Sequence, residues 1–481
     1  MCKLPDPAKK TTNYNVLDFG AIGDGKTNDT GAIQRAIDYC AQCGGGRIIF
    51  PGGHTFRSGS VVLRSFVELH LEAGAVLKAS DELSDFCLFG GAHPAVEAQA
   101  GPSYANSDYS GSPTLYFLYG KSCTNVAITG LGRIDGNETI FHGKITRWHI
   151  DGAFYPRMPL MYLEDITQLT LHQITLQNSA FWTVHMVGCN DVLIDGIRIL
   201  NNLRMGSSDG IDPDHCKNVR IVNCHVECAD DCIVLKNTEN AGKYGACENI
   251  VVQGCTLKST SAAIKIGTES EGAFRNIVVQ GCNISGTNRG ISLQLRDSGY
   301  IENALFSNIN IETRRFSPEH WWGSGEPIAI TALPRRETTA LGYIRNVRFE
   351  NINCRGENGI LIYGHSPEHI RSLSFRGVTL ALCKRTDWPR NEHDLRPSCT
   401  VQCVKDAPYY VYAKGAENVS FSDFWTEADA AVVADRALGN TELNLGDIVE
   451  ERKMLTGAVR LTGELAGELI LLRGNRKEVE T

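Results

Sequence analysis

The segment CENIVVQGCTLKS, residues 247–259, and its near-copy FRNIVVQGCNISG, residues 274–286, decide the fold class of this chain. Both alternate apolar and polar side chains, which is typical of a β-strand with one buried face. Units this short cannot bury that face alone, so successive units must stack. We therefore predict an all-β protein, a single-stranded right-handed parallel β-helix (a solenoid), and not a β-sandwich or propeller, because hairpin turn signals are sparse.

Related units continue from about residue 115 and begin at asparagine corners. The starting residues, spaced by 31, 27 and 27 positions, are Asn218, Asn249, Asn276 and Asn303. A chain of 481 residues would normally hold two or three domains, but a solenoid of this length can be one. We predict an amino-terminal tail over 1–13, a β-helix domain over 14–404, and a terminal coil or cap segment of the same domain over 405–481.

The first coils, residues 14–80, should include a short helical cap. Asn28 or Asp29 can begin this helix, and Gly44, Gly45 and Gly46 end it. Its expected apolar face consists of Ala32, Ile33, Ala36, Ile37 and Cys40. The glycines follow the helix instead of opening it and no G-K-[ST] is present, which excludes phosphate-loop and dinucleotide binding.

Composition excludes several partners. The 47 Lys and Arg residues against 55 Asp and Glu give a net charge of −8, which disfavours nucleic acid. No apolar run has the length of a signal peptide or membrane span, so we expect a cytoplasmic protein without a membrane partner. The 17 cysteines, an odd number at irregular spacings, favour a reducing compartment. We expect no metal and no cofactor, and the pattern does not indicate an oligomeric state.

The stretch CADDCIVLK, residues 228–236, places Asp230 and Asp231 inside an apolar segment. Asp209 precedes Asp230 by 21 residues, about one short coil, so three carboxylates can converge on one surface. On a strand the adjacent pair would face opposite ways unless a kink intervened. Three close acids cannot all ionise easily, and a protonated acid beside ionised ones suits glycoside hydrolysis. A solvated acidic cluster remains an alternative, as does a calcium site with Asp212 and Asp214 as further ligands.

Several ordered motifs together resemble those of the polygalacturonases of glycoside hydrolase family 28. They run from FGAIGDGKTNDTGAIQRAID (residues 19–38) through GLGRIDGN, NSAFWTVH and SSDGIDPD to ADDCIVLK and IKIGTES. The resemblance implies a right-handed parallel β-helix and hydrolysis with inversion at the anomeric carbon. It implies that Asp230 is the general acid and that Asp209 and Asp231 activate water. The implied partner is an oligosaccharide or polysaccharide substrate.

Two family motifs are altered. Ser261 and Ala262 stand where the family has the histidine of G-H-G, and Ser292 and Gln294 replace the charged residues of R-x-K. Nearby cations could bind a substrate carboxylate instead. The candidate substrate-binding residues of this region are Arg289, Arg296, Lys265 and Gln294.

Aromatic residues supply further candidates. Trp182 and His185 precede Asp209 by about one coil and could line a sugar subsite or belong to the core. Trp322, in the insertion HWWGSGEPIAI, and the insertion SYANSDYSGSPTLYF (residues 103–117) could border a groove. Such loops can close one end of a groove, so we expect an exo-acting hydrolase of galacturonate-containing pectic oligosaccharides. The alternatives are a rhamnogalacturonan or branched-pectin hydrolase, a β-helix polysaccharide lyase, and a non-catalytic carbohydrate-binding protein.

Overall fold

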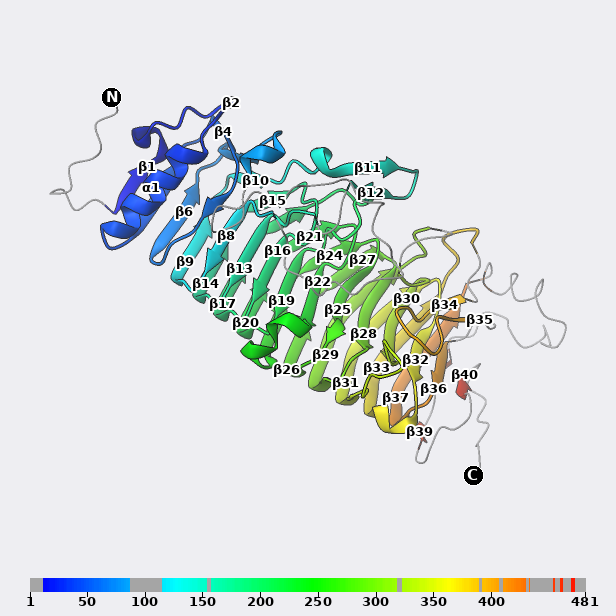
Figure 1. The fold of residues 1–481 in the computed structure, drawn as a ribbon. Helices are drawn as coiled ribbons and strands as arrows, with labels where there is room; N and C mark the ends of the chain where they lie inside the picture. The colour runs from blue at the N-terminus through cyan, green and yellow to red at the C-terminus, as the bar shows by residue number, and fades with distance from the viewer. Residues whose placement is uncertain are drawn as a thin grey trace. The chain divides into compact units, whose positions relative to one another are not determined.

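The computed structural model describes residues 12–86, 115–153, 157–317, 322–388, 392–405, 410–429 and 432, and three short strands between 453 and 471. These residues form two compact units, Met1–Cys255 and Thr256–Thr481. Both units consist almost entirely of parallel strands stacked in sequence order (Figure 1). The predicted parallel β-helix is therefore confirmed. The prediction of one domain over 14–404 remains a prediction.

The helical cap of the first unit forms as predicted. Helix α1 spans Thr30–Gln42, has Asp29 at its N-cap position, and buries the five apolar residues expected from the sequence. Figure 1 shows α1 beside the first strands, and it contacts β1, β3 and β6. Gly45 follows the helix with a φ of +105°, and a β-carbon there would lie 2.4 Å from the carbonyl oxygen of Phe66. Only glycine allows this approach of the chain.

Three rows of parallel strands form the coils of the first unit. The first row consists of β1 (Asn13–Asn15), β3 (Gly46–Phe50), β6 (Val67–Leu71), β9 (Thr124–Thr129), β14 (Thr167–His172), β17 (Asn190–Asp195), β20 (Lys217–Val222) and β23 (Cys247–Gln253). The second consists of β2 (Asp24–Asn28), β4 (Thr55–Ser58), β7 (Val76–Ala79), β10 (Arg133–Asp135), β15 (Thr175–Gln177), β18 (Arg198–Leu200) and β21 (His225–Cys228).

The third row carries the candidate site. It consists of β5 (Val61–Val62), β8 (Leu118–Lys121), β13 (Met161–Glu164), β16 (Val184–Val187), β19 (Ile211–Asp214) and β22 (Ile233–Asn237). The hairpin of β11 (His142–Ile145) and β12 (Ile150–Gly152) stands outside the stacked strands (Figure 1). The short 3₁₀ helices of this unit are η1 (Val16–Phe19), η2 (Leu83–Asp85), η3 (Glu138–Phe141) and η4 (Glu239–Tyr244).

The second unit repeats this arrangement with longer strands. One face contains β24 (Thr256–Ser259), β26 (Ala273–Gln280), β27 (Asn283–Thr287), β29 (Tyr300–Thr313), β31 (Tyr343–Gly356), β33 (Ile370–Leu382) and β37 (Glu417–Ala428). The other contains β25 (Ala262–Ser270), β28 (Arg289–Leu295), β30 (Glu326–Ala332), β32 (Ile360–Gly364) and β36 (Val411–Lys414). The helix η5 (Pro367–His369) precedes β33.

Repeated residues stabilise the stacking of the second unit. Four phenylalanines form a continuous stack in the core, with centroid separations of 5.1, 4.8 and 4.9 Å: Phe306, Phe349, Phe375 and Phe421. The four predicted asparagine corners, Asn218, Asn249, Asn276 and Asn303, have positive φ between 54° and 59°, and the second unit adds Asn346 and Asn418 at 54° and 53°. Asparagine tolerates this left-handed conformation better than most residues, which explains its recurrence.

The end of the chain adds antiparallel strands to the last coil. β38 (Lys453–Met454) and β39 (Val459–Leu461) pair with β37, and β40 (Leu469–Leu471) pairs with β36. Antiparallel pairing there covers strand edges that would otherwise be open. The terminal cap over 405–481 remains a prediction. A further hairpin, β34 (Glu392–Asp394) with β35 (Cys403–Lys405), precedes β36.

Candidate active site

Three aspartates meet where two neighbouring strands of the first unit begin. Asp209 lies in the turn before β19, and Asp230 and Asp231 lie in the bend between β21 and β22. Ile211 of β19 is in register with Ile233 of β22, so the segments that precede the two strands lie side by side. One oxygen of each carboxylate lies within 4.8 Å of the others. The predicted convergence of the three acids is confirmed, and their catalytic roles remain predictions.

The bend between β21 and β22 explains how two adjacent aspartates can face the same site. Neither Asp230 nor Asp231 belongs to a strand, so the alternation of side chains along a strand does not separate them. Backbone groups of the neighbouring turn hold the bend: the amide of Ser207 donates to Asp230 Oδ2 at 3.1 Å, and that of Gly210 donates to the Asp231 carbonyl at 2.8 Å. A β-carbon at Gly210 would lie 2.4 Å from the carbonyl oxygen of Cys232, which makes glycine necessary there.

Burial and mutual repulsion dominate the electrostatics of the three acids. Asp209, Asp230 and Asp231 are 2%, 8% and 1% exposed. Burial, and then the neighbouring charges of Asp230 and Asp212, raise the pKa of Asp209 well above its ordinary value. Asp209 therefore binds a proton more readily than an exposed aspartate does. Such a cluster can retain a proton under conditions in which an exposed aspartate would be ionised.

Two further charged residues complete the cluster: Lys236, which the sequence analysis did not single out, and Asp212, which it named only as a possible calcium ligand. Lys236, at the end of β22, places its Nζ atom 3.5 Å from Asp209 Oδ2 and 3.8 Å from Asp212 Oδ1. Asp212 is fully buried in β19, and burial raises its pKa well above the ordinary value. The sequence held a signal for Lys236, because it is a charged residue that directly follows three apolar residues of a short strand.

Trp182 and His185 flank this cluster but are buried. The Trp182 ring stacks on Phe181 at 5.1 Å and contacts His185 edge-on at 4.6 Å. His185 Nε2 lies 3.4 Å from Asp214 Oδ2. Burial alone would raise the pKa of Asp214, but the contacts with His185 and the Thr238 amide outweigh it and lower that pKa. This placement favours the core interpretation of Trp182 over a sugar-stacking platform.

The predicted cations of the second unit are also buried. Lys265 on β25 is in register with Ser292 on β28, and Gln294 follows on the same face of β28. The Arg296 guanidinium is fully buried and donates to the carbonyl oxygens of Leu295, Thr331 and Leu395. Burial and neighbouring arginines lower its pKa to about 9. A guanidinium without exposed surface is not placed to bind a sugar, so this structure does not support Arg296 as a substrate contact.

Arg289 is likewise part of an internal ion-pair network. Its Nε lies 3.4 Å from Glu326 Oε2, and its Nη2 donates to the carbonyl oxygen of Asp394. His393 Nδ1 lies 3.0 Å from Glu326 Oε1, and the Ser324 amide donates to Oε2 at 2.7 Å. Burial opposes ionisation of Glu326, but Arg289 and His393 outweigh it and lower the pKa to about 2. Arg289 and Arg296 thus both bind the backbone of the β34–β35 hairpin: Arg289 at the carbonyl of Asp394, and Arg296 at that of Leu395.

Trp322 is half-buried beside this network. The Arg396 guanidinium lies over its ring at 4.6 Å and also forms a two-pronged ion pair with Asp394, with contacts of 2.9 and 2.8 Å. The Asn288 side chain donates to the carbonyl oxygen of Trp322 at 2.8 Å. The neighbouring insertion residues 318–321, and residues 103–114 of the other predicted loop, lie outside the described residues. A contact between Trp322 and substrate remains a prediction.

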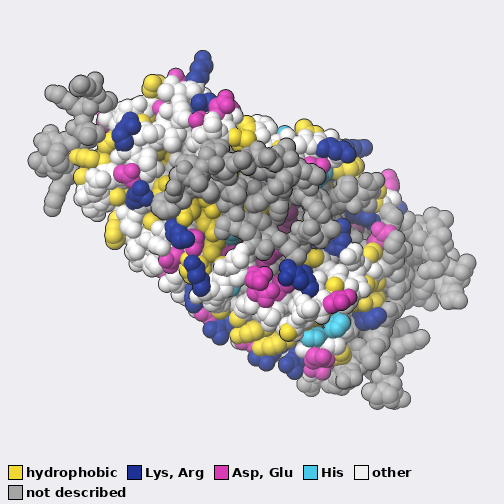
Figure 2. Space-filling model, viewed as in Figure 1, with side chains coloured by type: hydrophobic (Ala, Val, Ile, Leu, Met, Phe, Trp, Pro, Cys, Tyr) yellow, Lys and Arg dark blue, Asp and Glu magenta, His cyan; other side chains and the backbone are white. Residues whose placement is uncertain are grey.

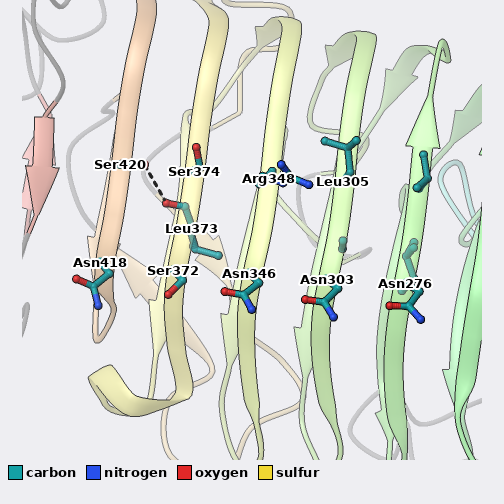
Figure 3. Close-up of a pocket in the computed structure, with 13 residues that line it drawn as sticks. Asn276, Asn303, Leu305, Asn346, Arg348, Ser372, Leu373, Ser374, Asn418 and Ser420 are labelled. Atoms are coloured by element: carbon teal, nitrogen blue, oxygen red, sulfur yellow. Dashed lines mark hydrogen bonds between the residues drawn. The ribbon is translucent and has the colours of Figure 1, made fainter.

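The concave surface on the second unit has different chemistry. It encloses about 920 Å³ over β26, β29, β31, β33 and β37 and is lined by a row of asparagines, with Ser372 replacing asparagine on β33 and Arg348 as the charged lining residue (Figure 3). It contains no carboxylate, so acid–base hydrolysis is not expected there. Among the described residues on the face shown in Figure 2, acidic and basic side chains are interspersed. No helix in the described part of the chain is long and apolar enough to cross a membrane.

Comparison with known proteins identifies the family. The model of glycosyl hydrolases family 28 matches residues 76–318, about half of the chain, and a model described as rhamnogalacturonase A/epimerase, pectate lyase-like, matches residues 13–107. A probable polygalacturonase of Vitis vinifera is 34% identical over 274 residues, which cover 54% of this chain and 52% of the relative. The chain spans about half the length of the curated relatives it matches.

Solved structures show the same fold. An exopolygalacturonase of Thermotoga maritima superimposes with a TM-score of 0.66 at 20% identity, over 88% of this chain and 92% of its own. A family 28 exopolygalacturonase of Yersinia enterocolitica has a TM-score of 0.58 at 20% identity, over 86% of this chain and 76% of its own. At this identity the likeness establishes the fold alone. With the family model matched across the three aspartates, the chain belongs to glycoside hydrolase family 28.

Proposed function

We propose that the protein is an inverting, exo-acting hydrolase of galacturonate-containing pectic oligosaccharides. The observation that carries this proposal is the convergence of Asp209, Asp230 and Asp231 at the starts of two adjacent coils, in the motifs SSDGIDPD and ADDCIVLK. A cluster that retains one proton and carries negative charge offers both an acid and a base. The probable polygalacturonase among the relatives supports the substrate class. The exo mode was expected from the insertions near the groove, and the exopolygalacturonases of like fold support it.

The three acids would divide the work as follows. Asp230, the most exposed of them, protonates the glycosidic oxygen as the bond to the anomeric carbon breaks. Asp209 and Asp231 together orient one water and accept its proton as it attacks the opposite face of the sugar. The close approach of the carboxylate oxygens resembles the roughly 5 Å spacing of retaining enzymes more than the wider inverting spacing. Inversion is therefore proposed from family membership.

Product analysis tests this assignment. Purified protein would be incubated with galacturonan oligosaccharides, and products followed by mass, reducing ends and the anomer first seen by proton NMR. Wild type should release monogalacturonate as the inverted anomer, and Asp230→Asn should reduce the rate by at least about a hundredfold because proton donation is lost. Asp191→Asn is the matched control, since Asp191 is half-exposed and pairs with Arg220. Random internal cuts would refute exo attack, and a retained anomer would refute inversion.

A second candidate substrate is rhamnogalacturonan or another branched pectic oligosaccharide. The match of residues 13–107 to the rhamnogalacturonase-type model favours it, as do Ser292 and Gln294 in place of the family's charged pair. Cleavage of these oligosaccharides without cleavage of galacturonan would establish this alternative. Absorbance of an unsaturated product would instead indicate a lyase, and binding without turnover on every glycan would indicate a carbohydrate-binding protein. We also propose that the protein acts in the cytoplasm on imported oligosaccharides.

A further inference from the structure

A buried lysine lies between two buried carboxylates at the candidate site. Lys236 is 3% exposed, and its ammonium group lies 3.5 Å from Asp209 and 3.8 Å from Asp212. The same nitrogen lies 4.1 Å from the centre of the Trp182 ring, which is within the range of a cation–π interaction. The lysine is therefore held from three sides and is positioned next to the carboxylate proposed to activate water.

Asp212 is the second anchor of this lysine. It is 0% exposed, and it lies two residues after Gly210 on the strand that begins beside Asp209. Two carboxylates in so little water repel one another, and one ammonium group can compensate only one of them. Lys236 and Asp212 consequently act on Asp209 with opposite sign: the lysine favours its ionised form, and the aspartate disfavours it.

We propose that Lys236 and Asp212 are positioning residues that together set the charge on Asp209, and thereby the pH range in which it can act as the general base. This inference rests on the proposed function. In this arrangement the Trp182 ring positions the Lys236 ammonium group by contact. The buried Asp212 has a role in the reaction without contact with substrate. The other titratable groups facing these three residues are Asp230, Asp231, Cys228, His185 and Asp214.

Opposite shifts in the pH profile provide the test. Lys236→Met removes the cation and keeps a side chain of similar length, so Asp209 should ionise only at higher pH. The acid limb of kcat/KM should move up by at least about one pH unit, which is a tenfold loss of kcat/KM at pH values below the limb. Asp212→Asn removes the competing charge, so the limb should move to lower pH. The double variant should lie between the two, and Lys236→Arg, which retains the charge, should lie nearer to wild type than Lys236→Met.

A purely structural role would lower stability or activity in these variants without moving the limb in opposite directions, and that result would overturn the proposal. Asp212→Ser, a smaller uncharged replacement, serves if Asp212→Asn does not fold. Thermal unfolding against pH gives a readout independent of turnover. Because burial raises the pKa of Asp209 and Asp212, their stabilising contribution is present below pH of about 4 and is lost as pH rises through the raised values.

In Lys236→Met the loss of stability with rising pH should continue to higher pH than in wild type. In Asp212→Asn this loss of stability should be smaller. If wild type hydrolyses no glycan, the proposed function fails, while the unfolding profiles still decide whether the lysine controls the charge of Asp209. Unfolding profiles that keep the wild-type dependence on pH in both variants would refute the control of charge even in an active enzyme.

Discussion

Replacement of Glu326 by glutamine tests whether Arg289 of β28 stabilises the fold through a buried ion pair. Glu326 is fully buried and receives contacts from Arg289, from His393 and from the Ser324 amide. The substitution keeps the size of the side chain but removes its charge, which leaves the Arg289 guanidinium without its buried counter-ion. A buried charge without its partner is strongly destabilising.

The magnitude follows from the pKa. Lowering the pKa of Glu326 from 4.5 to about 2 corresponds to about 3 kcal/mol of folding free energy at neutral pH. Because this pKa is lowered on folding, the stabilisation is complete above pH 4.5 and is lost as pH falls through about 2. The difference in stability between wild type and Glu326→Gln should therefore be about 3 kcal/mol at pH 7 and roughly half of that at pH 3.

Urea unfolding followed by tryptophan fluorescence at the two pH values measures this difference. Glu337→Gln is the matched control, because Glu337 is exposed on the same unit and should change stability by less than about 0.5 kcal/mol. Equal stability of Glu326→Gln and wild type at pH 7 would refute the reasoning. A difference that does not shrink at pH 3 would refute the assignment of the effect to the charge of Glu326.

Two further predictions concern the coils of the second unit. Phe375→Ala interrupts the phenylalanine stack between neighbours at 4.8 and 4.9 Å, and should lower the free energy of unfolding by about 3–5 kcal/mol, measured by chemical unfolding. Phe66→Ala is the control, because Phe66 is 54% exposed and its loss should lower the free energy of unfolding far less. Equal losses would mean that the stack is not a principal source of stability. Asn346→Ala should cost about 1 kcal/mol because its φ is 54°, and Asn346→Gly should cost less; the opposite order would contradict the conformational explanation.

The features that could be predicted from the sequence are those set by local pattern. The apolar face of α1 follows from helical spacing, and all five of its residues are buried as expected. The asparagine corners follow from a short-range conformational preference. The meeting of Asp209 with Asp230 followed from a spacing of about one coil, since stacking brings together residues one coil apart.

The features that could not be predicted depend on which strands cover one another. Lys236 is close to Asp209 only because β22 pairs with β19 in one particular register, which the sequence spacing does not specify to the residue. The burial of Arg296 depends on residue 395, about a hundred positions later, and no periodic pattern links the two segments. A charged residue near a family motif therefore looked like a substrate contact, although its partner lay in a distant hairpin.

The burial of these arginines limits how the altered R-x-K motif can be compensated. A guanidinium that donates to backbone carbonyls of a packed segment has few donors left for a substrate carboxylate, and releasing it would uncover that segment. Among the cations proposed from the sequence, Lys265 is then the remaining candidate, and it lies in register with Ser292, one of the two altered positions. An ammonium group binds a carboxylate as a point charge, without the two-pronged geometry of arginine. On the proposed function, substrate choice should therefore depend less on the orientation of a galacturonate carboxylate than in an enzyme that binds this carboxylate through arginine, which favours testing branched pectic oligosaccharides beside galacturonan.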